Sequence, residues 1–331
     1  MKFGVVIRYV GLVLLFNAAF MLISALISLF NGLDTGFYPL LVSFLITSII
    51  GSFPLIFVPN DNNLSNKESY VIVTMAWVMS CLLGMLPYLI WGGEFSPTNA
   101  WFESTSGFTT TGATILSDVE ALPKGLLFWR ASTHWVGGVG VVLFALVILP
   151  SMGRMKMSLT SAEMSMMAKD NFRYTTKKIL KIIVFIYAGL TLCETAALML
   201  VGMEPFDAVT NSFSTVATGG FCIRNQSIMY YHSVVIEIIV MFFMVVSGIH
   251  MGLVYATICG KRNNIFRSEV TRFYILSIVI CTAIVAAGLL MNHNYPPFGE
   301  AIRYGTFQVV SHITTTGFAS ASDALWPPLA I

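Results

Sequence analysis

Long apolar segments make up most of this 331-residue chain. A transmembrane helix needs about 20 mainly apolar residues, and seven segments meet that length. They run over residues 5–30, 37–58, 70–92, 125–150, 177–202, 232–258 and 271–291. Only 10% of the residues are charged, against about 25% in soluble domains. The sequence therefore predicts an all-α polytopic protein in a lipid bilayer and excludes a soluble globular domain.

Three shorter apolar segments, at about 97–108, 205–215 and 298–312, are too short to cross a bilayer. Each leads into a run rich in Thr and Gly, and each has Pro near its start. The runs are Phe102–Thr114, Thr215–Phe221 and Thr314–Phe318, and the prolines are Pro97, Pro205 and the pair Pro296–Pro297. Pro is accepted in the first turn of a helix. We expect three half-helices, each ending in a Thr/Gly run.

The three Thr/Gly runs predict an internal repeat. Aligning Gly112 with Gly219 gives a period of 107 residues, and aligning Gly219 with Gly317 gives 98. Three recurrences of Pro, half-helix and Thr-Gly make chance periodicity improbable. In this alignment Thr111 is equivalent to Thr218 and Thr316.

The repeat divides the chain into four predicted parts. An N-terminal pair of transmembrane helices (1–66) precedes pore unit 1 (67–155), pore unit 2 (156–262) and pore unit 3 (263–331). A third unit would need one more long span after its Thr/Gly run, and none is present. We therefore expect that unit 3 lacks its second helix and that the chain is incomplete at its C-terminus.

A Thr/Gly run at membrane depth has the chemistry of an ion filter. Backbone polar groups there must be paired or must line a wet cavity, and rings of carbonyl oxygens can replace the hydration shell of an alkali cation. Gly permits the backbone angles that turn carbonyls toward one axis, and the C-terminal end of a half-helix favours a cation. A single run would fit a tight turn equally well. Three matching runs favour the filter.

Basic residues predict the orientation of the chain. They gather in the loops after the fourth and sixth spans, at Arg154, Lys156, Lys169, Arg173, Lys177, Lys178, Lys261, Arg262, Arg267 and Arg272. By the positive-inside rule these loops and the N-terminus are cytoplasmic. The half-helices then enter the membrane from its outer face.

The stretch Phe102–Thr114, followed by Ala131–Gly140, resembles the first pore unit of the Trk/Ktr/HKT superfamily of potassium transporters. Ala217–Phe221 and Thr314–Phe318 resemble that family's second and third filter segments, and the resemblance covers the whole chain. It implies four joined helix–pore-helix–filter–helix units around one pseudo-fourfold pore, as in potassium channels. The implied potassium filter comprises Thr110, Thr111, Gly112, Ala217, Thr218, Gly219, Thr315, Thr316 and Gly317.

The resemblance also implies a function and partners. We expect potassium uptake across the bacterial inner membrane, as the pore subunit of a Trk-type system, with no enzymatic activity, no cofactor and no nucleic acid. A homodimer and a cytoplasmic nucleotide-binding regulatory subunit are the implied partners, and the loop Ser151–Lys178 is a candidate contact for that subunit. In the family a gating loop interrupts the helix that is missing here.

Three alternatives remain. A secondary cation symporter with broken helices is one, although half-helices that enter from one side argue against inverted repeats. A non-conducting truncated remnant is another. The third is a membrane haem protein using His134, His250 and His312. Because these histidines are scattered, one per unit, core or interfacial roles are favoured.

Two further sets of residues lie within the spans. For the glycines within the spans, close helix packing is favoured over a gating hinge. They are Gly137, Gly138 and Gly140 in the fourth span and Gly248 and Gly252 in the sixth. Glu194 and Glu237 fit a coupled-ion site or a neutral packing role. Arg130 is placed to pair with Glu103 or Glu120.

The five cysteines show no CxxC pairing and predict no disulfide or zinc site.

Overall fold

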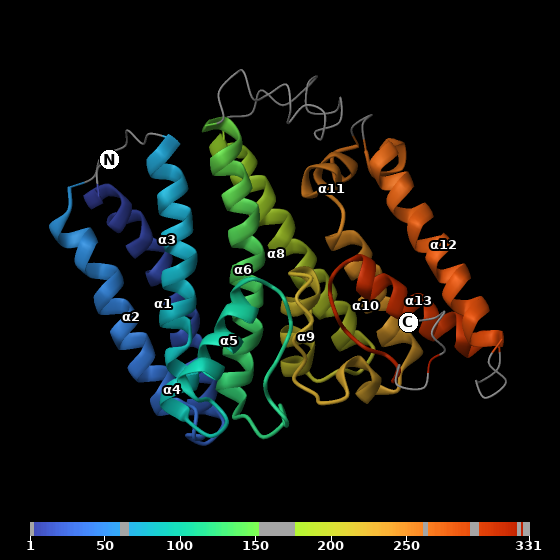
Figure 1. Cartoon of the computed structure of the whole chain (residues 1–331), viewed down its shortest axis with the longest axis horizontal. Coiled ribbons are helices and arrows are strands. Elements are labelled where there is room, and N and C mark those ends of the chain that lie inside the picture. Colours follow the sequence, from blue (N-terminus) through green and yellow to red (C-terminus); the bar gives the residue numbers. More distant parts are fainter. Residues whose placement is uncertain are drawn as a thin grey trace. The chain divides into compact units, whose positions relative to one another are not determined.

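The computed structural model describes residues 3–59, 66–151, 176–260, 264–291, 298–322 and 326, and within these ranges it contains helices and no strand (Figure 1). The α-helices are α1 (Phe3–Phe30), α2 (Phe37–Phe57), α3 (Asn66–Gly84), α4 (Leu86–Trp91), α5 (Pro97–Phe108), α6 (Lys124–Ser151), α8 (Thr176–Leu200), α9 (Pro205–Val216), α10 (Val234–Ser247), α11 (Met251–Ile258), α12 (Glu269–Met291) and α13 (Phe298–Ile313). Two 3-10 helices, η2 (Ser227–Tyr231) and η3 (Ile265–Arg267), join them. The all-α prediction is confirmed.

Six of the seven long apolar segments correspond to candidate membrane spans; the predicted fourth span, 125–150, forms helix α6 but is not among these candidates. Among the described residues, five helical stretches are long and apolar enough to cross a membrane, and six if one bent pair counts as a single span. α3 and α4 together make one of them, over Lys67–Trp91. Large apolar side chains of α2, such as Ile49, Phe53 and Ile56, are exposed, as expected for a helix that faces lipid.

The predicted sixth span, 232–258, is not one continuous helix. α10 ends at Ser247, α11 begins at Met251, and the two helices are bent by 104°. A Cβ added at Gly248 would lie 2.5 Å from the Tyr274 hydroxyl oxygen, and this hydroxyl donates to the carbonyl of Val245 (3.3 Å). The hydropathy pattern reports only the apolar length, so it missed the break.

The chain divides into two compact units, Met1–Ile182 and Ile183–Ile331. In the first unit α1 packs most extensively against α2 and also contacts α3 and α6. Its apolar core includes Val6, Val10 and Leu14 of α1 and Ala76 of α3. α5 lies against α3 and α6, so the spanning helices hold the first half-helix in place.

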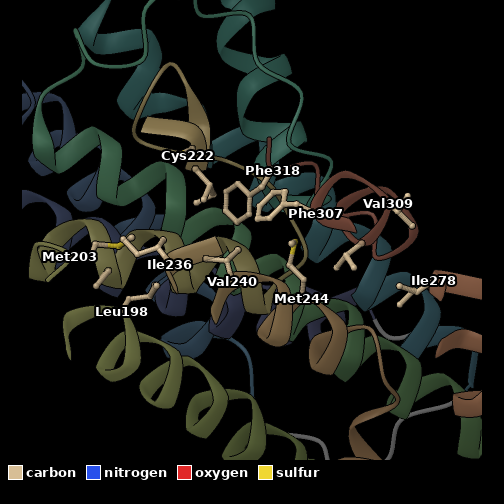
Figure 2. Close-up of a cluster of buried hydrophobic side chains, with 13 residues drawn as sticks. Leu198, Met203, Cys222, Ile236, Val240, Met244, Ile278, Phe307, Val309 and Phe318 are labelled. Carbon is tan, nitrogen blue, oxygen red and sulfur yellow. The ribbon is translucent and has the colours of Figure 1, made fainter. Parts of the chain in front are cut away.

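In the second unit, α9 and α13 are held by an apolar cluster (Figure 2). Val240 and Met244 of α10 lie in this cluster with Phe307 of α13 and Phe318, the last residue of the third Thr/Gly run. All four side chains are buried. The position of that run is therefore tied to the core of the unit.

The three predicted half-helices are present as α5, α9 and α13. Pro97 and Pro205 occupy first-turn positions of α5 and α9, where the missing N–H costs no helical hydrogen bond. The side chain of Ser96 caps α5 by accepting from the N–H of Asn99 (3.2 Å). Pro296 and Pro297 lie outside the described residues, as do residues 152–175 of the basic loop.

The close approach of α1 and α2 in the first unit can be tested by a substitution at Gly11. A Cβ at Gly11 would lie 2.5 Å from the carbonyl oxygen of Gly51, whereas a Cβ at Gly189 of α8 would meet nothing within 4 Å. Gly11→Ala should lower the melting temperature of the detergent-purified protein, because overpacking costs about 1–3 kcal/mol. Gly189→Ala, the matched control, should leave it unchanged or raise it, because Ala favours helix by about 1 kcal/mol. Equal melting temperatures for the two variants would contradict the close α1–α2 contact.

Candidate ion filter

The C-terminal ends of α5, α9 and α13 share one hydrogen-bond pattern. After each helix, one N–H bonds to the carbonyl three residues back and the next N–H to the carbonyl five residues back. With the N–H donor named first and the carbonyl acceptor second, the bonds are Thr110–Gly107 (3.0 Å) and Thr111–Ser106 (2.9 Å) after α5, Thr218–Thr215 (2.9 Å) and Gly219–Ser214 (2.8 Å) after α9, and Thr315–His312 (3.0 Å) and Thr316–Ser311 (2.9 Å) after α13. This is the Schellman arrangement, which satisfies carbonyls that a helix end leaves without partners.

The Schellman position that normally holds Gly is occupied by Thr in all three runs. Thr110, Thr218 and Thr315 have φ of 53°, 51° and 60°, in the left-handed region that β-branched residues rarely adopt. Such a conformation costs about 1–2 kcal/mol per residue. Strain repeated at three equivalent positions is typical of functional sites.

The glycine two residues after each strained threonine also has positive φ. These glycines are Gly112 (76°), Gly220 (82°) and Gly317 (83°). The alignment of Gly112 with Gly219 is therefore wrong by one residue, and Gly219 is equivalent to Thr111 and Thr316. The spacing of Pro97 and Pro205, 108 residues, is the signal that gives the correct register.

The second and third runs lie against each other within the second unit. A Cβ added at Gly220 would be 2.0 Å from the carbonyl oxygen of Thr316 and 3.3 Å from the carbonyl carbon of Gly317. Only a residue without a side chain fits there. The structure thus brings together two of the three predicted filter segments. The first, Thr110–Gly112, belongs to the other unit.

Carbonyl groups of the runs are available to a ligand. Among the described residues, no hydrogen bond ends on a carbonyl oxygen of residues 110–112, 218–220 or 315–317. Backbone carbonyls that lack protein partners need water or a cation. Successive unpaired carbonyls next to a helix C-terminus can supply oxygen ligands to an alkali cation.

Threonine side chains brace two of the runs. The hydroxyl of Thr109 lies 2.8 Å from that of Thr111 and donates to the carbonyl of Thr105 (2.7 Å). Thr314 is placed in the same way, 2.7 Å from Thr316 and 2.8 Å from the carbonyl of Val310. In the second run these positions are Ala217 and Gly219, so that run lacks this brace.

A buried ion pair supports the first run from behind. Glu103 of α5 and Arg130 of α6 are 0% and 3% exposed, and Arg130 Nε lies 2.6 Å from Glu103 Oε1. This confirms one of the two partners predicted for Arg130. The Glu103 carboxylate also accepts from the Thr114 hydroxyl (3.0 Å) and the Ile115 N–H (3.2 Å). It therefore joins α5, α6 and the segment that leaves the run.

The segment after the first run has a second anchor, outside the membrane spans. Glu94 Oε2 accepts from the Ser117 N–H (3.0 Å), and the Ser117 hydroxyl also donates to this carboxylate. These two hydrogen bonds favour the charged form, so the pKa of Glu94 is lowered from its ordinary value.

Acidic residues also hold arginines beside the second and third runs. Asp207 of α9 accepts from Arg224 (2.9 Å) and from the Tyr231 hydroxyl (2.8 Å). Glu237 of α10 forms a bidentate pair with Arg303 of α13, with both distances 2.6 Å. The sequence pattern places Glu237 in a span but does not reveal this partner. Paired charge is the arrangement in which a buried carboxylate is tolerated.

Two of the three histidines have backbone roles. His250 Nδ1 caps α11 by accepting from the Gly252 N–H (3.1 Å), and His312 Nδ1 lies 2.8 Å from the Gln308 carbonyl. His134 is buried in α6. Among the described residues, no group of three His, Cys, Asp or Glu is placed to hold a metal. None of the five cysteines, all of which lie among the described residues, forms a disulfide bond.

Close packing is confirmed for Gly137 of α6 but not for Gly140, where a Cβ would meet only the Trp77 ring at 4.0 Å. A Cβ at Gly137 would lie 2.2 Å from the carbonyl oxygen of Phe108, the last residue of α5. Gly137 thus lets α6 touch the end of the first half-helix. Gly248, in contrast, lies at the break between α10 and α11.

Comparison with known proteins places the chain in a family. Residues 40–331 match the TrkH family, described as "Cation transport protein". The chain belongs to the TrkH family. It is 35% identical over 340 residues to the Trk system potassium uptake protein TrkH of Escherichia coli K12, and 34% identical over 334 residues to that of Halomonas elongata. Each alignment covers 99% of this chain and 68% of the relative.

The TrkH likeness extends to the fold. The structure matches the crystal structure of the potassium transporter TrkH from Vibrio parahaemolyticus with a TM-score of 0.86 at 31% sequence identity. The match covers 99% of this chain and 68% of that one.

The ion pair behind the first run gives a stability test. Glu103→Leu alone should lower unfolding stability by about 3–5 kcal/mol, because it leaves Arg130 buried without its carboxylate. Glu103→Leu combined with Arg130→Met should recover part of this loss, because no buried charge then remains. The recovery is incomplete because Thr114 and Ile115 still lose an acceptor. Melting temperatures in detergent measure both, and a double variant no more stable than the single one would contradict the pairing.

Proposed function

We propose that this protein is the potassium-conducting subunit of a Trk-type uptake system in the bacterial inner membrane. The observation that carries the proposal is the recurrence of three helix ends with strained threonines and unpaired carbonyls. Membership of a cation transport family supports it, and the relatives named above are called potassium uptake proteins. Potassium is the transported ion, not a cofactor.

The filter that we propose is built from equivalent residues of the three runs. One layer of carbonyls comes from Thr110, Thr218 and Thr315, the next from Thr111, Gly219 and Thr316, and the third from Gly112, Gly220 and Gly317. Ala217 precedes the layers at the end of α9. Relative to the set predicted from the sequence, Gly220 is added, and Ala217, Thr218 and Gly219 each shift by one layer.

The wider architecture is also a proposal. Two N-terminal helices (1–66) precede pore units 67–155, 156–262 and 263–331, which contribute three quarters of a pseudo-fourfold pore. The basic loops and the N-terminus face the cytoplasm. A homodimer and a cytoplasmic nucleotide-binding regulatory subunit complete the assembly, and Ser151–Lys178 remains the candidate contact for that subunit.

A second candidate is coupled cation symport. The break between α10 and α11, with its 104° bend, favours it, because discontinuous helices are typical of secondary transporters. A dependence of potassium uptake on a sodium or proton gradient would distinguish symport from passage driven by the membrane potential alone.

The register of the second run provides the test. Gly220→Ala should reduce potassium uptake by about tenfold or more, because its methyl group meets the Thr316 carbonyl at 2.0 Å and positive φ adds about 1–3 kcal/mol of strain. Gly189→Ala, the control, should keep the uptake of the wild type, because Gly189 lies outside the proposed filter and a Cβ there would meet nothing within 4 Å. Uptake of rubidium or potassium by a potassium-uptake-deficient host, at matched membrane levels of the variants, measures both. Normal uptake by Gly220→Ala would refute the proposed filter.

A further inference from the structure

Each half-helix carries one buried polar side chain at an equivalent position, nine residues before the positive-φ glycine of its run. These residues are Glu103 in α5, Asn211 in α9 and Gln308 in α13. Their exposed fractions are 0%, 0% and 7%. Burial of a polar side chain is costly unless its hydrogen bonds are made. The recurrence of a polar residue at this position therefore directs attention to its partners.

The partners lie in the segments that leave the three runs. In the first unit, the Glu103 carboxylate accepts from the Thr114 hydroxyl (3.0 Å) and the Ile115 N–H (3.2 Å). In the second, Asn211 Oδ1 accepts from the thiol of Cys222 (3.4 Å), a member of the buried apolar cluster (Figure 2). Cys222 and Thr114 are equivalent, because each lies two residues after the glycine of its run.

The third unit repeats this connection with a different acceptor. Gln308 Nε2 donates to the carbonyl of Ala321 (3.1 Å), four residues after the glycine of the third run. We call residues 113–116, 221–224 and 318–321 the leaving segments. The Schellman bonds hold each run at the half-helix end, and these side chains hold it where the chain leaves. Each run is thus anchored on both sides of its free carbonyls.

The side-chain type at each position matches its partners. Glu103 meets only donors, including Arg130 (2.6 Å), and a carboxylate only accepts. Gln308 meets a backbone carbonyl, so an N–H donor is needed. Asn211 needs both functions, because the thiol donates to its oxygen while its own N–H donates to the Tyr231 hydroxyl (3.1 Å). Packing alone would not require this matching of donors to acceptors.

We propose that Glu103, Asn211 and Gln308 are positioning residues for cation selectivity, each joining a half-helix to the leaving segment of its own filter run. The carbonyls between the two anchors are thereby kept at a fixed distance from the ion. When one anchor is lost, the carbonyls can close around the smaller sodium ion, and potassium loses its advantage. The inference rests on the proposed function and deepens it.

Gln308 gives the first test, in protein expressed from its native gene and reconstituted into liposomes. Gln308→Met keeps a similar length but removes the donor, so the ratio of potassium to sodium flux should fall by about fivefold, the factor that corresponds to one hydrogen bond. Thr306→Val is the matched control, because the Thr306 hydroxyl donates to the Ile302 carbonyl within α13 (2.6 Å). Its flux ratio should equal that of the wild type. A ratio of fluxes, unlike their absolute size, does not change when less protein folds.

The second unit supplies a test of the pairing itself. Cys222→Ala removes the donor to Asn211 and should lower the flux ratio by about twofold, because a thiol is a weak donor. Cys222→Ser keeps a donor and should preserve the ratio. Asn211→Leu should lower it further, because the bond to Tyr231 is lost as well. In the Asn211→Leu background, Cys222→Ala should have no added effect.

Two outcomes would overturn the inference. One is a wild-type flux ratio in both Gln308→Met and Cys222→Ala. The other is an effect of Cys222→Ala that is as large in the Asn211→Leu background as in the wild type, because the thiol would then act independently of Asn211.

Failure of the proposed function is a separate result, since it shows as normal uptake by Gly220→Ala. Amide hydrogen exchange then decides the inference without any flux measurement. Exchange in the leaving segment 318–321 should be faster in Gln308→Met than in Thr306→Val, because the lost bond allows local opening. Equal exchange rates in the two variants would show that Gln308 does not hold this segment.

Discussion

Carbonyl groups inside a membrane impose the main constraint on this protein. A bilayer offers no water to an unpaired backbone oxygen, yet the runs after α5, α9 and α13 leave successive carbonyls without partners among the described residues. They persist because each run is tied to a helix end by two hydrogen bonds and forced through a left-handed threonine. The local strain is thus balanced by packing of the half-helices within each unit.

Ion pairs with buried carboxylates contribute to that packing. Glu103 with Arg130, Asp207 with Arg224, and Glu237 with Arg303 each join a half-helix to a neighbouring segment. A buried pair adds little stability over apolar residues of the same size. Its geometry is directional, however, and a directional contact suits a site where a small displacement of a carbonyl alters cation binding.

Much of the fold follows from local sequence patterns. Apolar length predicts the spanning helices, and Pro followed by a short apolar stretch predicts α5, α9 and α13. These signals are local, because helix length and capping depend on nearby residues. The alignment of Gly112 with Gly219 failed because the second run contains two adjacent glycines, and composition alone does not say which one has positive φ. Gly220 is identified by its backbone angle and by the Thr316 carbonyl beside it.

The sequence by itself determined that this is a helical membrane protein with three half-helices and three Thr/Gly runs, because hydrophobic length and turn chemistry are properties of short segments. Only the tertiary structure decided the partner of Glu103, the break at Gly248, the contact of Gly220 with the third run and the complete burial of Glu194. Each of these depends on residues far apart in the chain. Their approach is set by packing of whole helices, which no short segment encodes.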